Sequence, residues 1–260
     1  MKTLSENEKK ALRYYIGDVF GNDTFYGDKK AYIVINSLFF PDIFSESARA
    51  AEGKYLNTAI IEDVPRLLGF FEDLFSVFGK VRLKNDYTTY RVERMADFEL
   101  CHRYGRTISM TSTAISGFLD SYRDRRGIAL MKFRLAEGNH CINVAETLDY
   151  YAKPEETEIL IPPFMEMKIR ENSLADSERR ITDCDGNPPV ISVAAEIGGI
   201  CGMSDGQDVE LYRCNAGIRL YKALNEGNTP DSDDIAEYIL WKKLFQKQLK
   251  KMFSEKMTAS

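Results

Sequence analysis

The 260-residue sequence is poor in the residues that build metal centres and disulfide frameworks. It has only two histidines, and its five cysteines are odd in number and widely spaced: Cys101, Cys141, Cys184, Cys201 and Cys214. No Cys-x-x-Cys pair occurs, and the histidines lack the spacing of metal ligands. We therefore expect reduced thiols and no metal site.

Several nucleotide-binding and protease motifs are also missing. The sequence contains no Gly-x-Gly-x-x-Gly, no Gly-x-x-x-x-Gly-Lys-[Ser/Thr] and no His-Glu-x-x-His. A Rossmann dinucleotide site, a P-loop and a zinc protease of the His-Glu class therefore have no local support.

Long apolar runs and an excess of positive charge are absent as well. No apolar run approaches the roughly 20 residues of a membrane-spanning helix. The charged start, residues 1–10, lacks the apolar region of a signal peptide. Lysine and arginine total 35 against 40 acidic residues, a net charge of −5, which argues against a nucleic-acid partner. We expect no membrane span and a location that is cytoplasmic, or exported as an effector without a cleavable signal peptide.

Helical patterns fill the first 80 residues. Ser5 and Glu8 have the spacing of a capping box, and apolar residues follow at helical intervals. A second helix is expected over residues 45–61. Asp63 and Pro65 have the pattern of a helix start before an apolar stripe that ends near Gly79. We assign residues 1–80 to a helical lobe.

The middle of the chain is rich in strand-forming residues. Six strands are predicted, over residues 87–94, 106–113, 127–134, 158–161, 165–169 and 190–197. Their short spacing favours hairpins and meanders over βαβ crossovers. A final helix is predicted from Asp231 to Leu249. The outline is α+β, with a β core over residues 81–200 and a mostly helical extension over 201–260, all within one domain.

The acidic run at residues 155–158 is the sharpest chemical feature. If the strand begins at Glu156, then Glu156 and Glu158 project from one face, about 7 Å apart along the backbone. One carboxylate of such a pair can stabilise a positive charge while the other acts as a base. The alternative is a solvated acidic loop that leads into a strand.

Two further features lie on predicted strands. Arg91 stands in an otherwise uncharged Tyr-Thr-Thr-Tyr stretch, where its guanidinium can hold a phosphate or brace a strand. The alternative is a surface cation on an edge strand. The hydroxyls of Thr111, Ser112 and Thr113 can bond a ribose or an arginine, and the alternative is a polar run without a specific role.

Taken in order, the arginine, the hydroxyl triplet and the Glu-x-Glu before Ile-Leu-Ile-Pro-Pro resemble the mono-ADP-ribosyltransferases of the arginine–serine–glutamate class. That class includes clostridial actin-modifying toxins and vertebrate arginine-specific ectoenzymes. The resemblance extends to residues 4–15 and 34–38, which are similar to the start of the family's helical lobe. Residues 127–135 are similar to its next core strand, so the resemblance covers about residues 4–170.

The resemblance implies a split mixed β core with an N-terminal helical lobe, a C-terminal helical tail and NAD in a cleft. It implies transfer of ADP-ribose from NAD to an arginine of a protein acceptor. Glu158 would stabilise the cation formed at the ribose, Glu156 would orient the acceptor, and Arg91 would brace the site. The other implied NAD-binding residues are Thr111, Ser112, Thr113, Phe118, Arg123 and Arg126. Tyr150 and Tyr151 are the candidates for acceptor recognition.

The sequence also departs from the family pattern. Tyr90-Arg91-Val92 replaces the favoured Tyr-Arg-Gly, and Thr-Ser-Thr replaces Ser-Thr-Ser at residues 111–113, which leaves open which hydroxyl bonds the ribose or the arginine. Two alternative functions also remain open. One is a NAD glycohydrolase with water as acceptor, and the other is an inactive NAD-binding or interaction module on the same fold.

Overall fold

A computed structural model describes residues 3–17, 31–40, 62–115, 126–149, 157–171, 178, 181–202 and 210–259. The chain forms two compact units. Residues 1–80 and 203–260 make a helical unit, and residues 81–202 make a sheet unit. The helix expected over 45–61 lies outside the described residues.

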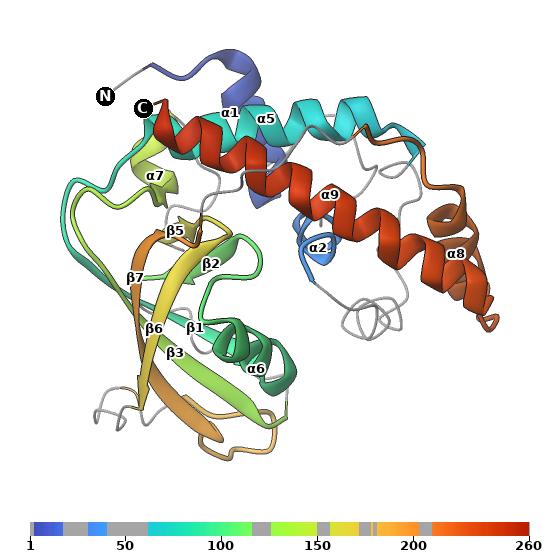
Figure 1. Cartoon of the computed structure of the whole chain (residues 1–260). Helices are drawn as coiled ribbons and strands as arrows, with labels where there is room; N and C mark the ends of the chain where they lie inside the picture. The colour runs from blue at the N-terminus through green and yellow to red at the C-terminus, as the bar shows by residue number, and fades with distance from the viewer. Residues whose placement is uncertain are drawn as a thin grey trace. The chain divides into compact units, whose positions relative to one another are not determined.

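The helical unit contains five described helices of four or more residues: α1 (Glu6–Ile16), α2 (Ala31–Ser37), α5 (Val64–Lys80), α8 (Asn215–Asn225) and α9 (Ser232–Thr258). The expected caps are present. Ser5 and Glu8 close the capping box of α1, Asp63 accepts from the main chain of Arg66, and Asp231 caps α9. In Figure 1, α9 runs alongside α5. The final helix is therefore confirmed, and it extends beyond the predicted Leu249.

Aromatic packing holds α5 to α9. Phe71 of α5 contacts Phe245 of α9 with ring centroids 5.9 Å apart, and Phe75 contacts Phe253 at 5.2 Å, both edge to face. All four rings are fully buried. Edge-to-face pairs add about 0.5–1.5 kcal/mol to the stabilisation that burial itself provides. The apolar stripe that predicted α5 thus forms the core of this unit.

The sheet unit contains seven described strands and two helices. The strands are β1 (Tyr87–Arg94), β2 (Thr111–Ala114), β3 (Ile128–Leu135), β4 (Ile142–Asn143), β5 (Glu158–Ile161), β6 (Met165–Glu171) and β7 (Ile191–Ile200). The helices are α6 (Met95–Tyr104) and α7 (Val144–Thr147). The α+β class expected from the sequence is confirmed.

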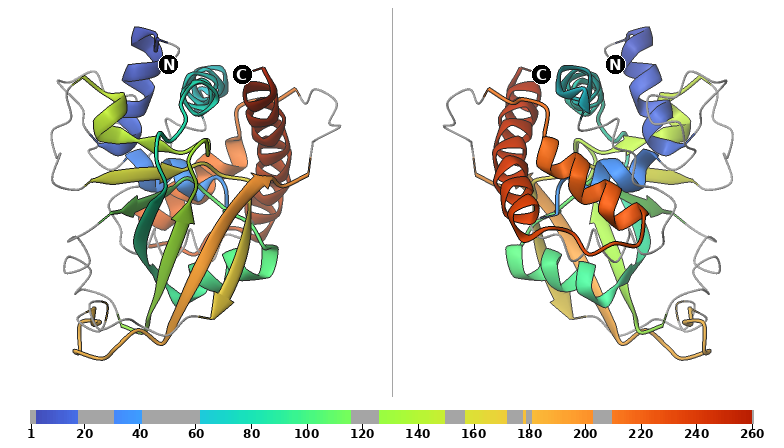
Figure 2. Two further views of the ribbon diagram at one scale, coloured as in Figure 1. Left: turned by 90° about the vertical axis from the view of Figure 1, so that its left-hand side faces the viewer. Right: turned by 90° about the vertical axis from the view of Figure 1, so that its right-hand side faces the viewer.

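The strand order is β4-β5-β2-β1-β3-β7-β6, and the sheet is mixed because β3 and β7 pair in parallel. The parallel pair is a departure from the expected hairpins and meanders, since β4, β5 and β6 all intervene in sequence. The junction of β1 and β2 has one registered pair, Tyr90 with Ala114. In both views of Figure 2, the short strands β2 and β5 run across the direction of β3 and β7. The sheet is therefore split into two parts that meet at β1 and β2.

Strand β2 is shorter than the prediction for residues 106–113. The first residues of the predicted strand do not pair within the sheet ladder. The hydroxyl of Thr107 instead donates to the carbonyl of Pro162 at 2.8 Å and accepts from the main chain of Met165 at 2.9 Å. Arg106 forms only an isolated bridge with Glu166. These bonds attach residues 106 and 107 to the β5–β6 turn, so the ladder of β2 begins at Thr111.

Candidate functional site

Three of the residues singled out from the sequence form one hydrogen-bonded chain where the two parts of the sheet meet. Arg91 lies on β1, Ser112 on β2 and Glu158 at the start of β5. Nη1 of Arg91 donates to the carbonyl oxygen of Ser112 at 2.8 Å. The hydroxyl of Ser112 donates to Oε1 of Glu158 at 2.5 Å. Residues 21 and 46 positions apart in sequence are thereby joined.

The register of β2 with β5 identifies the relevant hydroxyl of the triplet. Ser112 pairs with Leu160 and Ala114 pairs with Glu158, so Ser112 and Glu158 are diagonal neighbours on one face. Thr111 and Thr113 point to the opposite face, since side chains alternate along a strand. The Thr113 hydroxyl donates to the carbonyl of Ile159 at 2.8 Å, and that of Thr111 to the carbonyl of Ser109 at 3.2 Å. The structure therefore places Ser112 beside Glu158, while both threonine hydroxyls bond the main chain.

Glu93 is a site residue that the sequence analysis missed. It lies two positions after Arg91 on the same face of β1, and Nε of Arg91 donates to its carboxylate. Glu93 is 9% exposed, so the ion pair is largely screened from solvent. The spacing of two residues in a strand was the signal that could have identified it. Glu93 and the carbonyl of Ser112 together fix the guanidinium through two different nitrogens.

The environment of the neighbouring Cys101 disfavours its thiolate form. Burial raises its pKa to about 12, and the negative charge of Glu93 contributes to this shift. The thiol therefore stays protonated at neutral pH, and the reactive thiolate does not form. The charged groups of the site are the carboxylates of Glu93 and Glu158 and the guanidinium of Arg91.

Glu158 is itself buried, with 8% of its surface exposed, although it begins a strand. The preceding residue, Thr157, has a φ of +44°, in the left-handed region that a β-branched residue rarely adopts. The Thr157 hydroxyl is buried and has no hydrogen-bond partner in the described part of the chain. Strained backbone of this kind costs about 1–3 kcal/mol and tends to occur at functional sites. This strained conformation lies directly before Glu158.

The other residues assigned from the sequence fall into two groups. Arg126 is described: its Nε lies 3.1 Å from Oδ2 of Asp185, and its side chain is mostly exposed. No hydrogen bond between described residues joins it to Arg91, Ser112 or Glu158. The second group lies outside the described residues, and its members are Phe118, Arg123, Tyr150, Tyr151 and Glu156.

Metal chemistry finds no support among the described residues. No group of three or more histidine, cysteine, aspartate or glutamate side chains there can hold a metal ion. Residues 202–206 match Gly-x-Ser-x-Gly, and residues 203–209, which include this serine, lie outside the described residues. None of the described helices is long and apolar enough to cross a membrane.

Comparison with known proteins gives similarity in structure alone. No protein-family model matches the sequence, and no curated protein matches it. The structure is similar to BECa, an ADP-ribosylating toxin of a binary enterotoxin of C. perfringens solved with NADH. The match has 16% identity and a TM-score of 0.46, and it covers 75% of this chain and 44% of that one. This chain thus matches less than half of the length of BECa.

Two other solved structures are also similar. An ADP-ribosyltransferase from Clostridium botulinum matches at 15% identity and a TM-score of 0.43, over 75% of this chain and 88% of that one. The Clostridium limosum C3 exoenzyme matches at 16% identity and a TM-score of 0.43, over 75% and 86%. Likeness at this level does not assign an activity, which has to be argued from the residues of the site.

Proposed function

We propose that this protein is a mono-ADP-ribosyltransferase that transfers ADP-ribose from NAD to an arginine side chain of a protein. The observation that carries the proposal is the chain of contacts from Arg91 through Ser112 to Glu158. Three polar residues on three strands, far apart in sequence, converge at the β1–β2 junction, which has a single registered pair. Their convergence is what a reaction site requires.

The polar groups fit a dinucleotide substrate that carries ribose hydroxyls and a diphosphate. The guanidinium of Arg91 supplies fixed N–H donors for phosphate or ribose oxygens. The Glu158 carboxylate is an acceptor for a ribose hydroxyl, and the Ser112 hydroxyl orients that carboxylate. Among the described residues, Arg91, Ser112 and Glu158 are therefore assigned to NAD.

The chemical step is cleavage of the glycosidic bond between the ribose C1′ and nicotinamide. The bonding pair leaves with nicotinamide, and positive charge develops on the ribose, as in glycoside hydrolysis. The buried carboxylate of Glu158 stabilises that charge, because charges interact more strongly where water is excluded. A guanidinium nitrogen of the acceptor then bonds C1′ and loses its proton to a base.

Arginine is assigned as the acceptor on the Glu-x-Glu pattern. Glu156 precedes the buried Glu158 by two residues, and a second carboxylate there can orient a guanidinium and accept its proton. Tyr150 and Tyr151 precede this segment and are proposed to contact the acceptor protein. Water as the acceptor would give NAD hydrolysis, and the same assay measures both reactions.

The test is to incubate the protein with labelled NAD, with and without agmatine, which carries a guanidinium. Parent protein is expected to release nicotinamide and to label agmatine. Glu158→Gln keeps the shape of the side chain but removes its charge, and we expect at least a 100-fold loss of both activities with NAD binding retained. Glu166→Gln, an exposed glutamate on β6, is the matched control and should retain parent activity.

Each result assigns one function. Labelled agmatine supports arginine transfer, and free ADP-ribose without labelled agmatine indicates a NAD glycohydrolase. Absence of NAD binding indicates an interaction module. Turnover of Glu158→Gln within tenfold of the parent would remove Glu158 from the mechanism.

A further inference from the structure

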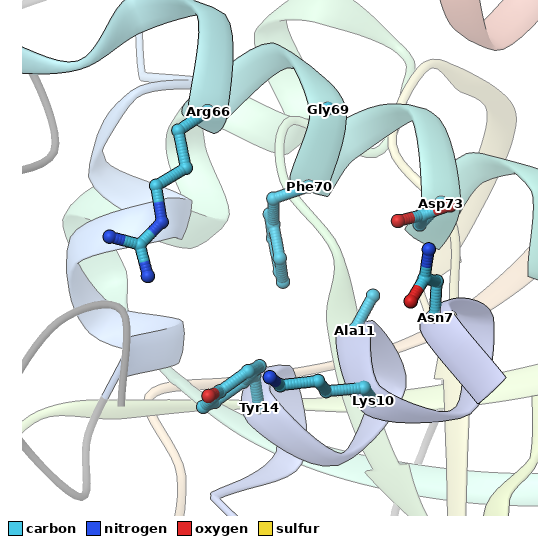
Figure 3. Close-up of a pocket in the computed structure, with 8 residues that line it drawn as sticks. All are labelled: Asn7, Lys10, Ala11, Tyr14, Arg66, Gly69, Phe70 and Asp73. Atoms are coloured by element: carbon cyan, nitrogen blue, oxygen red, sulfur yellow. The ribbon is translucent and has the colours of Figure 1, made fainter. Parts of the chain in front are cut away.

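A groove between α1 and α5 has the composition of a binding site, and it belongs entirely to the helical unit. Its volume is about 450 Å³, within the range of small-molecule sites. Figure 3 shows the side chains that line it, all from these two helices. Arg91, Ser112 and Glu158 all belong to the sheet unit, and none of these three residues lines this groove.

Gly69 keeps the groove open at a cost to the helix. Glycine is the weakest helix former after proline, yet Gly69 lies inside the 17-residue helix α5. A Cβ atom built at Gly69 would have no other atom within 4 Å. Packing between the helices therefore does not require glycine here, whereas a larger side chain would fill the groove that Gly69 lines.

One end of the groove is cationic. In Figure 3, the guanidinium of Arg66 and the hydroxyl of Tyr14 lie to one side of Phe70, and the ammonium of Lys10 lies below the Phe70 ring, next to Tyr14. Nζ of Lys10 lies 5.6 Å from the centroid of the Tyr14 ring. A guanidinium, an ammonium and a hydroxyl are the donors that bind phosphate oxygens.

The other end offers an amide and a carboxylate. Asn7 and Asp73 lie on the far side of the Phe70 ring (Figure 3). Burial raises the pKa of Asp73 above its usual value, and the negative charges of Glu8 and Glu72 raise it further. A hydrogen-bond donor that reaches Asp73 would therefore relieve repulsion. Asparagine pairs with the edge of adenine, and aspartate accepts from an exocyclic base amine.

We propose that this groove binds a nucleoside 5′-phosphate whose base carries an exocyclic amine. The phosphate lies at Lys10 and Arg66, the base stacks near Phe70, and its amine edge meets Asn7 and Asp73. The phosphate, the base and the amine edge of the ligand thus each meet side chains of matching chemistry that line the groove. The inference does not depend on the transferase activity.

Calorimetry on the full chain with three probes tests the chemistry of both ends. AMP should bind, and adenosine, which lacks the phosphate, should bind at least tenfold more weakly. IMP, which has a carbonyl in place of the amine, should also bind at least tenfold more weakly, because a site built for an amine leaves its acceptors unpaired. No AMP binding at millimolar concentration overturns the proposal, and so does equal affinity for AMP and IMP or for AMP and adenosine.

Variants locate the binding. Gly69→Leu should weaken AMP binding at least tenfold, and Arg66→Gln should do the same at an exposed position, where no core packing is disturbed. Gly69→Ala should raise Tm by about 2–4 °C, because alanine is the better helix former. Glu166→Gln, at an exposed position of the sheet unit, should leave AMP affinity unchanged. AMP binding that survives both Gly69→Leu and Arg66→Gln, or that is lost in Glu166→Gln, overturns the proposal, as does a fall in Tm for Gly69→Ala.

Discussion

The hydroxyl of Ser112 donates to Oε1 of Glu158 at 2.5 Å across the β2–β5 pair. This bond joins the middle residue of the hydroxyl triplet to the carboxylate that is assigned to bond cleavage. Because Glu158 is buried, the donor supplies a hydrogen bond that water would otherwise provide. The orientation of the carboxylate therefore depends on one side chain of the neighbouring strand.

We expect Ser112→Ala to lower nicotinamide release by roughly 10–100-fold, because a hydrogen bond to a charged group contributes about 1.5–3 kcal/mol. Ser112→Thr retains the hydroxyl and should retain most of the activity. Thr113→Val, whose hydroxyl bonds the carbonyl of Ile159, is the control. It should lower Tm but leave the turnover of the folded protein within about threefold. Parent activity in Ser112→Ala would show that this bond is structural only.

Arg91→Lys should impair turnover although the charge is kept. Arg91 donates through Nε to Glu93 and through Nη1 to the carbonyl of Ser112, and an ammonium cannot reproduce a planar fork. We expect at least a tenfold loss of kcat/KM for nicotinamide release. Thermal unfolding serves as the control: a large fall in Tm would assign Arg91 to the fold, while unchanged turnover at unchanged Tm would contradict the prediction.

Glu156→Gln should separate the two reactions. If Glu156 serves the acceptor, agmatine labelling should fall at least tenfold while nicotinamide release with water stays within about threefold, because water needs no guanidinium partner. Both activities are measured in the parent and in the variant. Parallel loss would mean that Glu156 and Glu158 act as one unit, and parallel retention would mean that Glu156 lies in a solvated acidic turn.

The sequence predicted the elements that have strong local signals. The capping box at Ser5 and the apolar stripe after Asp63 located α1 and α5, and the runs at 87–94 and 158–161 located β1 and β5. The sequence did not predict α6, because its apolar residues do not form one clear face and Arg94 makes no side-chain cap. It also missed α8, where the thiol of Cys214 accepts from the main chain of Gly217 and takes the place of a usual capping oxygen.

The candidate site was predictable in its residue types but not in its geometry. The triplet at 111–113 offered three hydroxyls. Strand alternation places Ser112 on one face and both threonines on the other, but it does not tell which face meets the site. Only the pairing of Ala114 with Glu158 selects Ser112. The contact of Glu93 with Arg91 differs, because residues two apart in a strand share a face and their spacing is a local signal. The choice of Ser112 comes from the pairing of strands that are distant in sequence, which local patterns do not contain.

A fourth prediction concerns the pH dependence of stability. Glu8 is buried, and its carboxylate accepts hydrogen bonds from Ser76 at 2.6 Å, from Lys80 at 2.8 Å and from the main chain of Ser5 at 2.7 Å. Burial acts to raise the pKa of Glu8, but these hydrogen bonds outweigh it and lower the pKa below the usual value. A lowered pKa stabilises the folded state at neutral pH, and this contribution is lost as the pH falls below about 4.5 and through the folded-state pKa.

We therefore expect Glu8→Gln to lower the free energy of unfolding by about 1.5–3 kcal/mol at pH 7. The difference from the parent should shrink at pH 3, where Glu8 of the parent is increasingly protonated. Urea unfolding at both pH values measures it. Glu6→Gln, an exposed position on the same helix, is the matched control with little effect at either pH. An equal difference at pH 7 and pH 3 would contradict the prediction.

The single registered pair between β1 and β2 has a consequence for how this protein can change over evolutionary time. On one side lie β1, β3, β7 and β6, and on the other β4, β5 and β2, each side with its own ladder of hydrogen bonds. Substitutions at distant sites that share no partner act independently. Among the described residues, exposed positions of β6 such as Lys168 and Arg170 share no hydrogen bond or ion pair with Glu158 and can therefore diverge without displacing it, whereas changes at Arg91 or Ser112 affect both sides together. We therefore expect substitutions to accumulate faster at exposed positions on the outer edge of the sheet than at the junction of β1 and β2.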